Sequence, residues 1–213
     1  MSTQECYEKI ASPSGRIQKK FSEMIWAEEI RGLTKDRSIR IMFQDEARFG
    51  RISDPRRCWA PYPVRPVVHT AIVQEFTYTY AAVSHVDGVL DSLILPAVNT
   101  DMMNLFLEEV AIRHSEGFIV MLMDKAGWHT AKDLHIPENM YILHLPPYSP
   151  ELNPVEHIWD DLREKDFANR VFEDIDALEI HLMYSLSMLE EDCERIRSIT
   201  GWSWIINANL NTK

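Results

Sequence analysis

Two short segments, about thirty residues apart, constrain the fold of this chain more than any other feature. Residues 118–123 form an apolar run that ends on Asp124, and Gly127 follows shortly after. Such a run, closed by a turn signal, predicts a buried strand with a carboxylate at its tip. Residues 145–154 are rich in proline and lead into a helical pattern whose first turn holds Glu156. The two carboxylates are therefore expected to meet at one edge of a sheet.

A third acid, Asp45, comes directly after the predicted strand run 39–44. Three acids placed in this way predict a divalent metal site for phosphoryl transfer, because carboxylate oxygens are the ligands that hard cations prefer. Glu46 would point to the opposite face of the strand, since alternate side chains along a strand face opposite ways. Asp45 shares the parity of the apolar residues Ile41 and Phe43, so we assign Asp45 rather than Glu46 to the site.

On the residues alone, each of these positions has a structural alternative. Glu156 lies three residues after Asn153, which is the spacing of a capping box, so it could serve only to cap its own helix. Asp124 could simply end a strand as a turn residue. Trp128 and Trp159 are more typical of a core than of a surface that stacks on DNA bases.

Length and composition predict one domain with a full hydrophobic core. The chain has 213 residues, of which 46% are hydrophobic. We expect the domain to span residues 16–200, with an N-terminal extension over 1–15 and a polar tail over 201–213. Three scattered cysteines show no disulfide or metal-ligand spacing, and no apolar stretch is long enough for a membrane span. We therefore expect a cytoplasmic protein without a membrane partner.

Charge is segregated along the chain. The formal net charge is -11, which opposes binding to nucleic acid except where basic residues cluster. One such cluster exists, because five arginines lie between residues 48 and 65, whereas residues 151–194 are strongly acidic. The arginines could also be no more than a solvated hairpin.

Apolar periodicity and turn signals predict an alternating order of elements. The expected elements are a helix at 16–31, a strand at 38–44, a second strand from 57–60 with 67–71, a hairpin of 76–83 and 89–95, a helix at 100–114, strands at 118–123 and 140–145, a helix from 154 that is capped by Asn153, and a helix at 174–199. This order is similar to the ribonuclease H-like fold. The expected fold class is therefore α/β, with a mixed five-stranded sheet flanked by helices and with further C-terminal helices.

Several blocks of the sequence resemble the catalytic domain of bacterial insertion-sequence DDE transposases related to the mariner superfamily. These blocks are residues 43–50, 57–61, 124–129 and 146–159, and residues 168–172 continue the pattern. The resemblance covers about residues 16–195. The proline-rich block before Glu156 is far more specific than any lone pair of acids.

This resemblance implies that Asp45, Asp124 and Glu156 form the acidic triad of a DDE transposase. It implies two Mg²⁺ (or Mn²⁺) ions, with Asp124 bridging them and the other two acids each holding one side. The implied reaction is metal-dependent DNA strand cleavage and strand transfer, with insertion at TA dinucleotides. Two metal ions suit this chemistry because they can activate the attacking oxygen and stabilise the leaving oxygen.

Four further residues are candidates for binding substrate, namely His129, Lys125, Arg48 and Arg51. His129 could touch phosphate or support a metal-binding carboxylate. The chain departs from its relatives at Lys125, where they commonly carry a small or amide residue. The Lys125 ammonium could pair with Asp124 or contact phosphate. A second departure is Pro63, where relatives often have glycine.

Relatives usually begin with helix-turn-helix modules that read the element ends. The expected partner is therefore DNA, both as the element ends and as a TA target. We also expect a helix-turn-helix segment that is separate or missing, and a second copy of the chain in a homodimer. A bacterial, nucleoid-associated location follows from such partners. Two alternatives remain open, namely another nuclease of the ribonuclease H-like fold, and an inactive or domesticated fragment that acts as a protein-interaction module through the acidic residues 151–194.

Overall fold

The computed structural model describes residues 32, 37–52, 55–146 and 152–201. The helix predicted at 16–31 lies outside these residues, as do the N-terminal extension and the tail beyond Gly201. Residues 147–151 of the proline-rich block also lie outside them.

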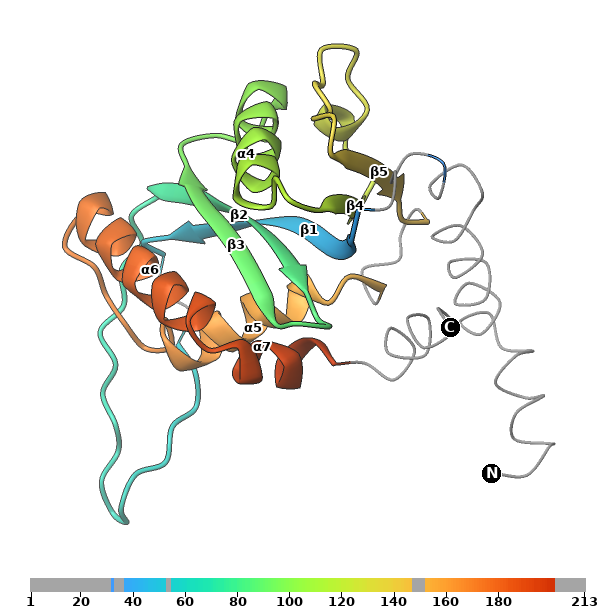
Figure 1. Ribbon diagram of the computed structural model, residues 1–213. Coiled ribbons are helices and arrows are strands. Elements are labelled where there is room, and N and C mark those ends of the chain that lie inside the picture. Colours follow the sequence, from blue (N-terminus) through green and yellow to red (C-terminus); the bar gives the residue numbers. More distant parts are fainter. Residues whose placement is uncertain (1–31, 33–36, 53–54, 147–151, 202–213) are drawn as a thin grey trace, which may run out of the picture.

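Five strands form one mixed sheet in the order β3-β2-β1-β4-β5 (Figure 1). The strands are β1 (Ile39–Gly50), β2 (Phe76–Ser84), β3 (Val89–Leu95), β4 (Phe118–Met123) and β5 (Met140–His144). The first three are antiparallel neighbours, whereas β4 and β5 run parallel to β1. The strand β1 therefore lies at the centre of the sheet, where neighbours cover both of its edges.

Helices cover both faces of this sheet (Figure 1). One face is covered by α4 (Thr100–Arg113), and the other by α5 (Val155–Lys165), α6 (Ile175–Glu190) and α7 (Cys193–Thr200). A short 3₁₀ helix, η1 (Gly127–His129), follows β4. None of the helices in the described ranges combines the length and apolar character that a membrane span requires.

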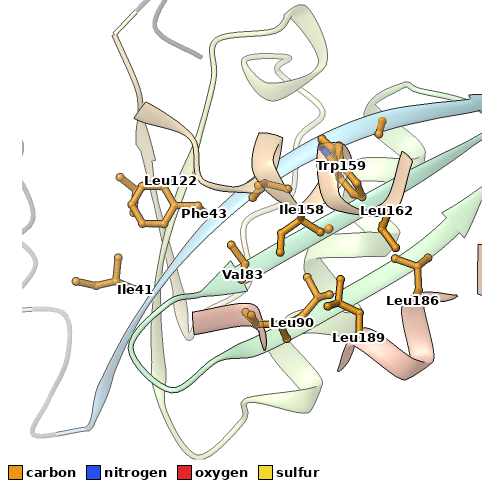
Figure 2. Packing of buried hydrophobic residues seen from close by; sticks show 14 of the residues in the cluster. Ile41, Phe43, Val83, Leu90, Leu122, Ile158, Trp159, Leu162, Leu186 and Leu189 are labelled. Carbon is orange, nitrogen blue, oxygen red and sulfur yellow. The ribbon is translucent and has the colours of Figure 1, made fainter. Parts of the chain in front are cut away.

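Alternation along β1 divides the core into two layers. Ile41 and Phe43 pack with α5, α6 and α7, whereas Met42 packs with α4. Figure 2 shows the first layer, in which Trp159 and Leu186 lie close to the strands. Each fully buried large apolar side chain contributes roughly 1.5–3 kcal/mol to this packing. The period-2 pattern that predicted β1 therefore also decides which face each of its side chains joins.

Most predicted elements are present, but three differ. The second strand predicted at 57–60 and 67–71 is wrong: these residues pair with no strand and belong to an exposed arm, teal in Figure 1, between β1 and β2. The single helix predicted at 174–199 is two helices, because the Asp192 carboxylate accepts a hydrogen bond from Arg195 N (2.9 Å) and starts α7 as a separate helix. Strand β1 is longer than predicted and runs through Asp45 to Gly50.

The turn between β2 and β3 depends on Gly88. This residue has a φ of 70°, in the region that favours glycine, and a Cβ at this position would lie 2.2 Å from the backbone oxygen of Cys193. We expect Gly88→Ala to lower the free energy of unfolding by roughly 1–3 kcal/mol, because it adds both backbone strain and a clash with α7. Urea denaturation measures this change. Gly127→Ala is the matched control, since no atom lies within 4 Å of its added Cβ, and an equal loss in both variants would contradict the expectation.

Candidate active site

The register of the central strands brings two of the predicted acids together. Phe43 on β1 pairs with Leu122 on the parallel strand β4. Asp45 follows Phe43 by two residues, and Asp124 follows Leu122 by two residues. Because neighbouring strands lie about 4.8 Å apart, this register puts the two acids side by side at the end of β4.

The Asp45 carboxylate points toward the face covered by α5. Its Oδ2 accepts a hydrogen bond from Trp159 Nε1 (3.0 Å), and the Trp159 ring is fully buried. Burial, followed by the negative charges of Glu156 and Glu46, raises the pKa of Asp45 to about 7, although the Trp159 hydrogen bond opposes this shift. Asp45 is therefore close enough to Glu156 for the two charges to repel each other.

Glu156 reaches this position because the start of α5 is tied to β1. Asn153 donates from Nδ2 to the backbone oxygen of Gln44 (2.9 Å), directly before Asp45, while its Oδ1 accepts from the first backbone N–H of α5 (3.2 Å). The N-cap of α5 is Pro154, one residue later than predicted, and no side chain caps the helix there. Asn153 thus joins helix to strand as well as supporting the first turn.

Glu46 points the other way and belongs to a second group of side chains. Its Oε1 accepts hydrogen bonds from Trp128 Nε1 (3.0 Å) and His129 Nε2 (2.9 Å). The other ring nitrogen of His129 donates to Asp124 Oδ1 (2.7 Å), which also accepts from Ala126 N (2.9 Å). His129 therefore bridges Glu46 and Asp124, and its side chain is only 1% exposed.

A bridge of this kind requires both ring nitrogens of His129 to carry protons. Burial alone would lower the pKa of His129, but the hydrogen bonds and charges of Glu46 and Asp124 outweigh burial and raise it. The protonated imidazole is consequently favoured. It fixes one oxygen of the Asp124 carboxylate.

This arrangement of strands and helices recurs in known proteins. Residues 40–179 match the family described as DDE superfamily endonuclease. The chain belongs to this family. An uncharacterized protein of Sinorhizobium fredii (strain NBRC 101917 / NGR234), y4pE/y4sA, is 35% identical over 130 residues, which is 61% of this chain and 96% of that protein.

Solved structures of Mos1 transposase share the fold of this DDE superfamily member. The Mos1 paired-end complex with the left transposon end is 18% identical, with a TM-score of 0.53 over 87% of this chain and 62% of the Mos1 chain. The Mos1 mariner paired-end complex with Mn is 16% identical, with a TM-score of 0.56 over 92% of this chain and 62% of that chain. The chain thus spans about six-tenths of the length of these Mos1 chains. The predicted family and ribonuclease H-like fold are confirmed.

The three predicted acids of this DDE domain, Asp45, Asp124 and Glu156, fall into two groups by the contacts of their side chains. Among the described residues, no group of three or more His, Cys, Asp or Glu side chains is arranged to hold a metal ion. Asp124 is hydrogen-bonded to His129, whereas Asp45 is hydrogen-bonded to Trp159 and lies close enough to Glu156 for their charges to repel each other. The donor set nevertheless fits a divalent cation, because these are hard carboxylate oxygens and two of them repel each other.

The other predicted substrate-binding residues lie in different settings. Lys125 is exposed and makes no ion pair with any described residue, so it does not compete for Asp124 here. Arg48 lies with its guanidinium 5.0 Å from the ring centre of Phe76. The Arg51 guanidinium already has partners in the folded protein. It pairs with Glu75 and donates to the backbone oxygens of Phe172 and Glu173, which lie between α5 and α6.

Sequence reasoning missed the roles of Glu46, Trp128 and Trp159. Parity did predict that Glu46 faces away from Asp45, but it carries no information about what lies on that face. The partners of Glu46 are 82 and 83 residues away in the chain. Indole N–H groups usually find an acceptor when buried, which is the one general signal that could have suggested a carboxylate partner for each tryptophan.

The hydrogen bond between Glu46 and His129 should favour the protonated form of His129. We expect Glu46→Ala to lower the pKa of His129, because the variant removes a hydrogen bond and a negative charge that favour the protonated ring. An NMR titration of the imidazole resonances measures this pKa. Glu109→Ala, which removes a carboxylate paired with Arg113 on α4, should leave it unchanged. A His129 pKa that stays the same in both variants would show that the bridge does not exist in solution.

Proposed function

We propose that this DDE domain catalyses metal-dependent cleavage and strand transfer of DNA, as the catalytic domain of a transposase. The observation that supports the proposal is the placement of the acids along the backbone, because the β1–β4 register sets Asp124 beside Asp45 and the start of α5, which carries Glu156, is tied to β1 directly before Asp45. Membership of the endonuclease family supports the same reaction class. In this proposal Asp45, Asp124 and Glu156 form the catalytic triad.

These three carboxylates would hold two Mg²⁺ or Mn²⁺ ions. When bound, such ions supply activation of a water or DNA 3′-hydroxyl and stabilisation of the leaving oxygen. Repulsion between Asp45 and Glu156 favours cation binding, because a cation offsets both charges at once. Mos1 complexes with Mn and with Mg support the choice of metal.

The chain's own residues prepare the site for this reaction. Trp159 holds one oxygen of Asp45, and the Glu46–His129 contact holds one oxygen of Asp124. Because each carboxylate has a second oxygen that these contacts leave available, both can be oriented by the protein and still bind metal. His129 is therefore a positioning residue in this proposal, as His129 acts through Asp124.

DNA is the proposed partner, and the Mos1 complex with a transposon end supports this class of substrate. We propose element ends and a TA target as the two DNA sites. Selective recognition of the ends would come from a helix-turn-helix segment, since reading base edges in the major groove requires a recognition helix. A homodimer would process two ends together, in association with the bacterial nucleoid.

A cleavage assay tests this proposal directly. The full chain, joined to a helix-turn-helix segment, is incubated with end-labelled element-end duplex in Mg²⁺, in Mn²⁺ and in EDTA. Strand nicking is expected in either metal and absent in EDTA. A protein that binds the duplex but nicks no strand in either metal would overturn the proposed reaction.

A further inference from the structure

A cavity of about 190 Å³ lies where the end of β1 meets the turn after α5. Among the described residues that line it are four arginines, Arg48, Arg56, Arg163 and Arg170, and none of these lining residues is acidic. One water needs only about 10–15 Å³ of such volume, so a phosphate group fits with water around it. In a chain of net charge -11, this cavity is a local concentration of positive charge.

The walls of the cavity are held together by contacts between distant parts of the chain. Asn169, at a φ of 60°, accepts a hydrogen bond at Oδ1 from Arg56 N (2.8 Å). Arg51 donates to the backbone oxygen of Phe172 (3.2 Å) and also to that of Glu173. The segment after β1 is thus fixed to the turn after α5 at two points. The arginines are consequently presented by an ordered frame.

Aromatic rings form the apolar part of the lining and hold one guanidinium in place. Phe49 and Phe167 lie with ring centres 4.9 Å apart, and Phe167 and Phe172 with centres 5.7 Å apart. The guanidinium carbon of Arg163 lies 5.6 Å from the centre of the Phe49 ring. A cation–π contact of this kind uses none of the N–H donors of the guanidinium for a hydrogen bond, so they can still bind an anion.

The chemistry of the cavity selects a phosphate. Guanidinium groups stay protonated at any physiological pH, so several of them around one cavity favour an anion there. Their fork of N–H donors matches the oxygens of a phosphate in a bidentate arrangement. Two sources could supply that group, namely the backbone of a nucleic-acid strand and free phosphate.

The position of the cavity relative to the three acids favours a nucleic-acid strand as the source of the phosphate. Arg163 follows Glu156 by seven residues on α5, which is about 10 Å along the helix axis. Phe49 follows Asp45 by four residues on β1, which is about 13 Å along the strand. A DNA strand advances about 3.4 Å per nucleotide. The cavity therefore lies within a few nucleotides of the acids.

We propose that this cavity binds a backbone phosphate of the DNA strand, within a few nucleotides of the bond that reacts at Asp45, Asp124 and Glu156. The assignment of the reacting bond rests on the proposed function. The phosphate contact itself does not, because it requires neither metal nor cleavage. It is independent of sequence, since a phosphate carries no base identity.

Salt-dependent DNA binding by the full chain tests this assignment. Fluorescence anisotropy in EDTA, at several salt concentrations, gives the slope of log K against log salt for wild type, Arg163→Gln and Lys165→Gln. Removing one phosphate contact should reduce this slope by about 1 and weaken binding equally for element-end and scrambled duplexes. Lys165→Gln removes the same charge from the same helix, but Lys165 pairs with Asp161 and does not line the cavity. Its slope should match wild type.

Arg163→Lys keeps the charge and should keep the slope, which separates loss of a phosphate contact from loss of fold. Equal slopes for wild type and Arg163→Gln would overturn the assignment. A slope reduced as much by Lys165→Gln or Arg163→Lys would also overturn it. If inorganic phosphate shifts the Arg163 Nε–H resonance while Arg163→Gln leaves the DNA slope unchanged, the cavity takes free phosphate and the assignment to DNA fails. A protein that never nicks DNA, but shows the expected slope change, would refute the proposed function and leave the phosphate contact standing.

Discussion

Asp124→Asn is expected to lower the rate of DNA nicking by about 10³-fold in Mg²⁺. A carboxylate that holds metal contributes several kcal/mol of transition-state stabilisation, and each 1.4 kcal/mol or so corresponds to a factor of ten in rate. Asparagine keeps the shape of the side chain and an oxygen that can accept from Ala126 N and His129. The variant therefore removes charge while it preserves the turn after β4. Single-turnover nicking of an end-labelled duplex measures the rate.

Asp133→Asn provides the matched control for this variant. Asp133 is an exposed acid in the segment between β4 and β5, so its loss changes net charge equally without touching the acids of the site. Its nicking rate should stay close to wild type. Wild-type rates in Asp124→Asn, with DNA binding intact, would show that Asp124 holds no catalytic metal.

The sheet could be predicted from sequence because its signals are local. Apolar runs and turn residues predicted the four strands other than β1 to within a residue or two, and the same period predicted opposite faces for Asp45 and Glu46. Helix α4 followed from its apolar periodicity, and the side chain of Asn99 N-caps it by accepting a hydrogen bond from Met102 N. The position of each element therefore followed mostly from a few neighbouring residues.

What could not be predicted depends on contacts between distant residues. Residues 57–60 carry strand-like composition, yet they find no partner strand and remain in an exposed arm. The bridge from Glu46 through His129 to Asp124 joins β1 to the segment after β4, and no periodicity describes such a contact. The arginine cavity likewise depends on Asn169 and Arg51, which connect segments more than a hundred residues apart.

Asp45→Asn is expected to stabilise the metal-free protein at pH 8 by on the order of 4 kcal/mol, with little effect near pH 4. The folded-state pKa of Asp45 is raised from 3.8 to about 7, so folded protein keeps a proton that the unfolded chain releases above about pH 4. The free energy of unfolding therefore falls as pH rises between these two values. Asparagine carries no charge, so this loss is absent in the variant. Because water reaches part of the site, this stabilisation of about 4 kcal/mol is an upper bound.

Urea denaturation in EDTA at several pH values measures the difference between the two proteins. Asp160→Asn is the control, since Asp160 is exposed on the same helix as Glu156 and its loss changes the net charge equally. Its stability should follow wild type at every pH. Parallel curves for wild type and Asp45→Asn would show that the pKa of Asp45 is not raised in the folded protein. Divergence above about pH 5, with the variant more stable, is the result expected for a carboxyl whose pKa is raised by burial and by neighbouring negative charges. Adding Mg²⁺ should then stabilise wild type more than Asp45→Asn, because only wild type offers the cation both charges.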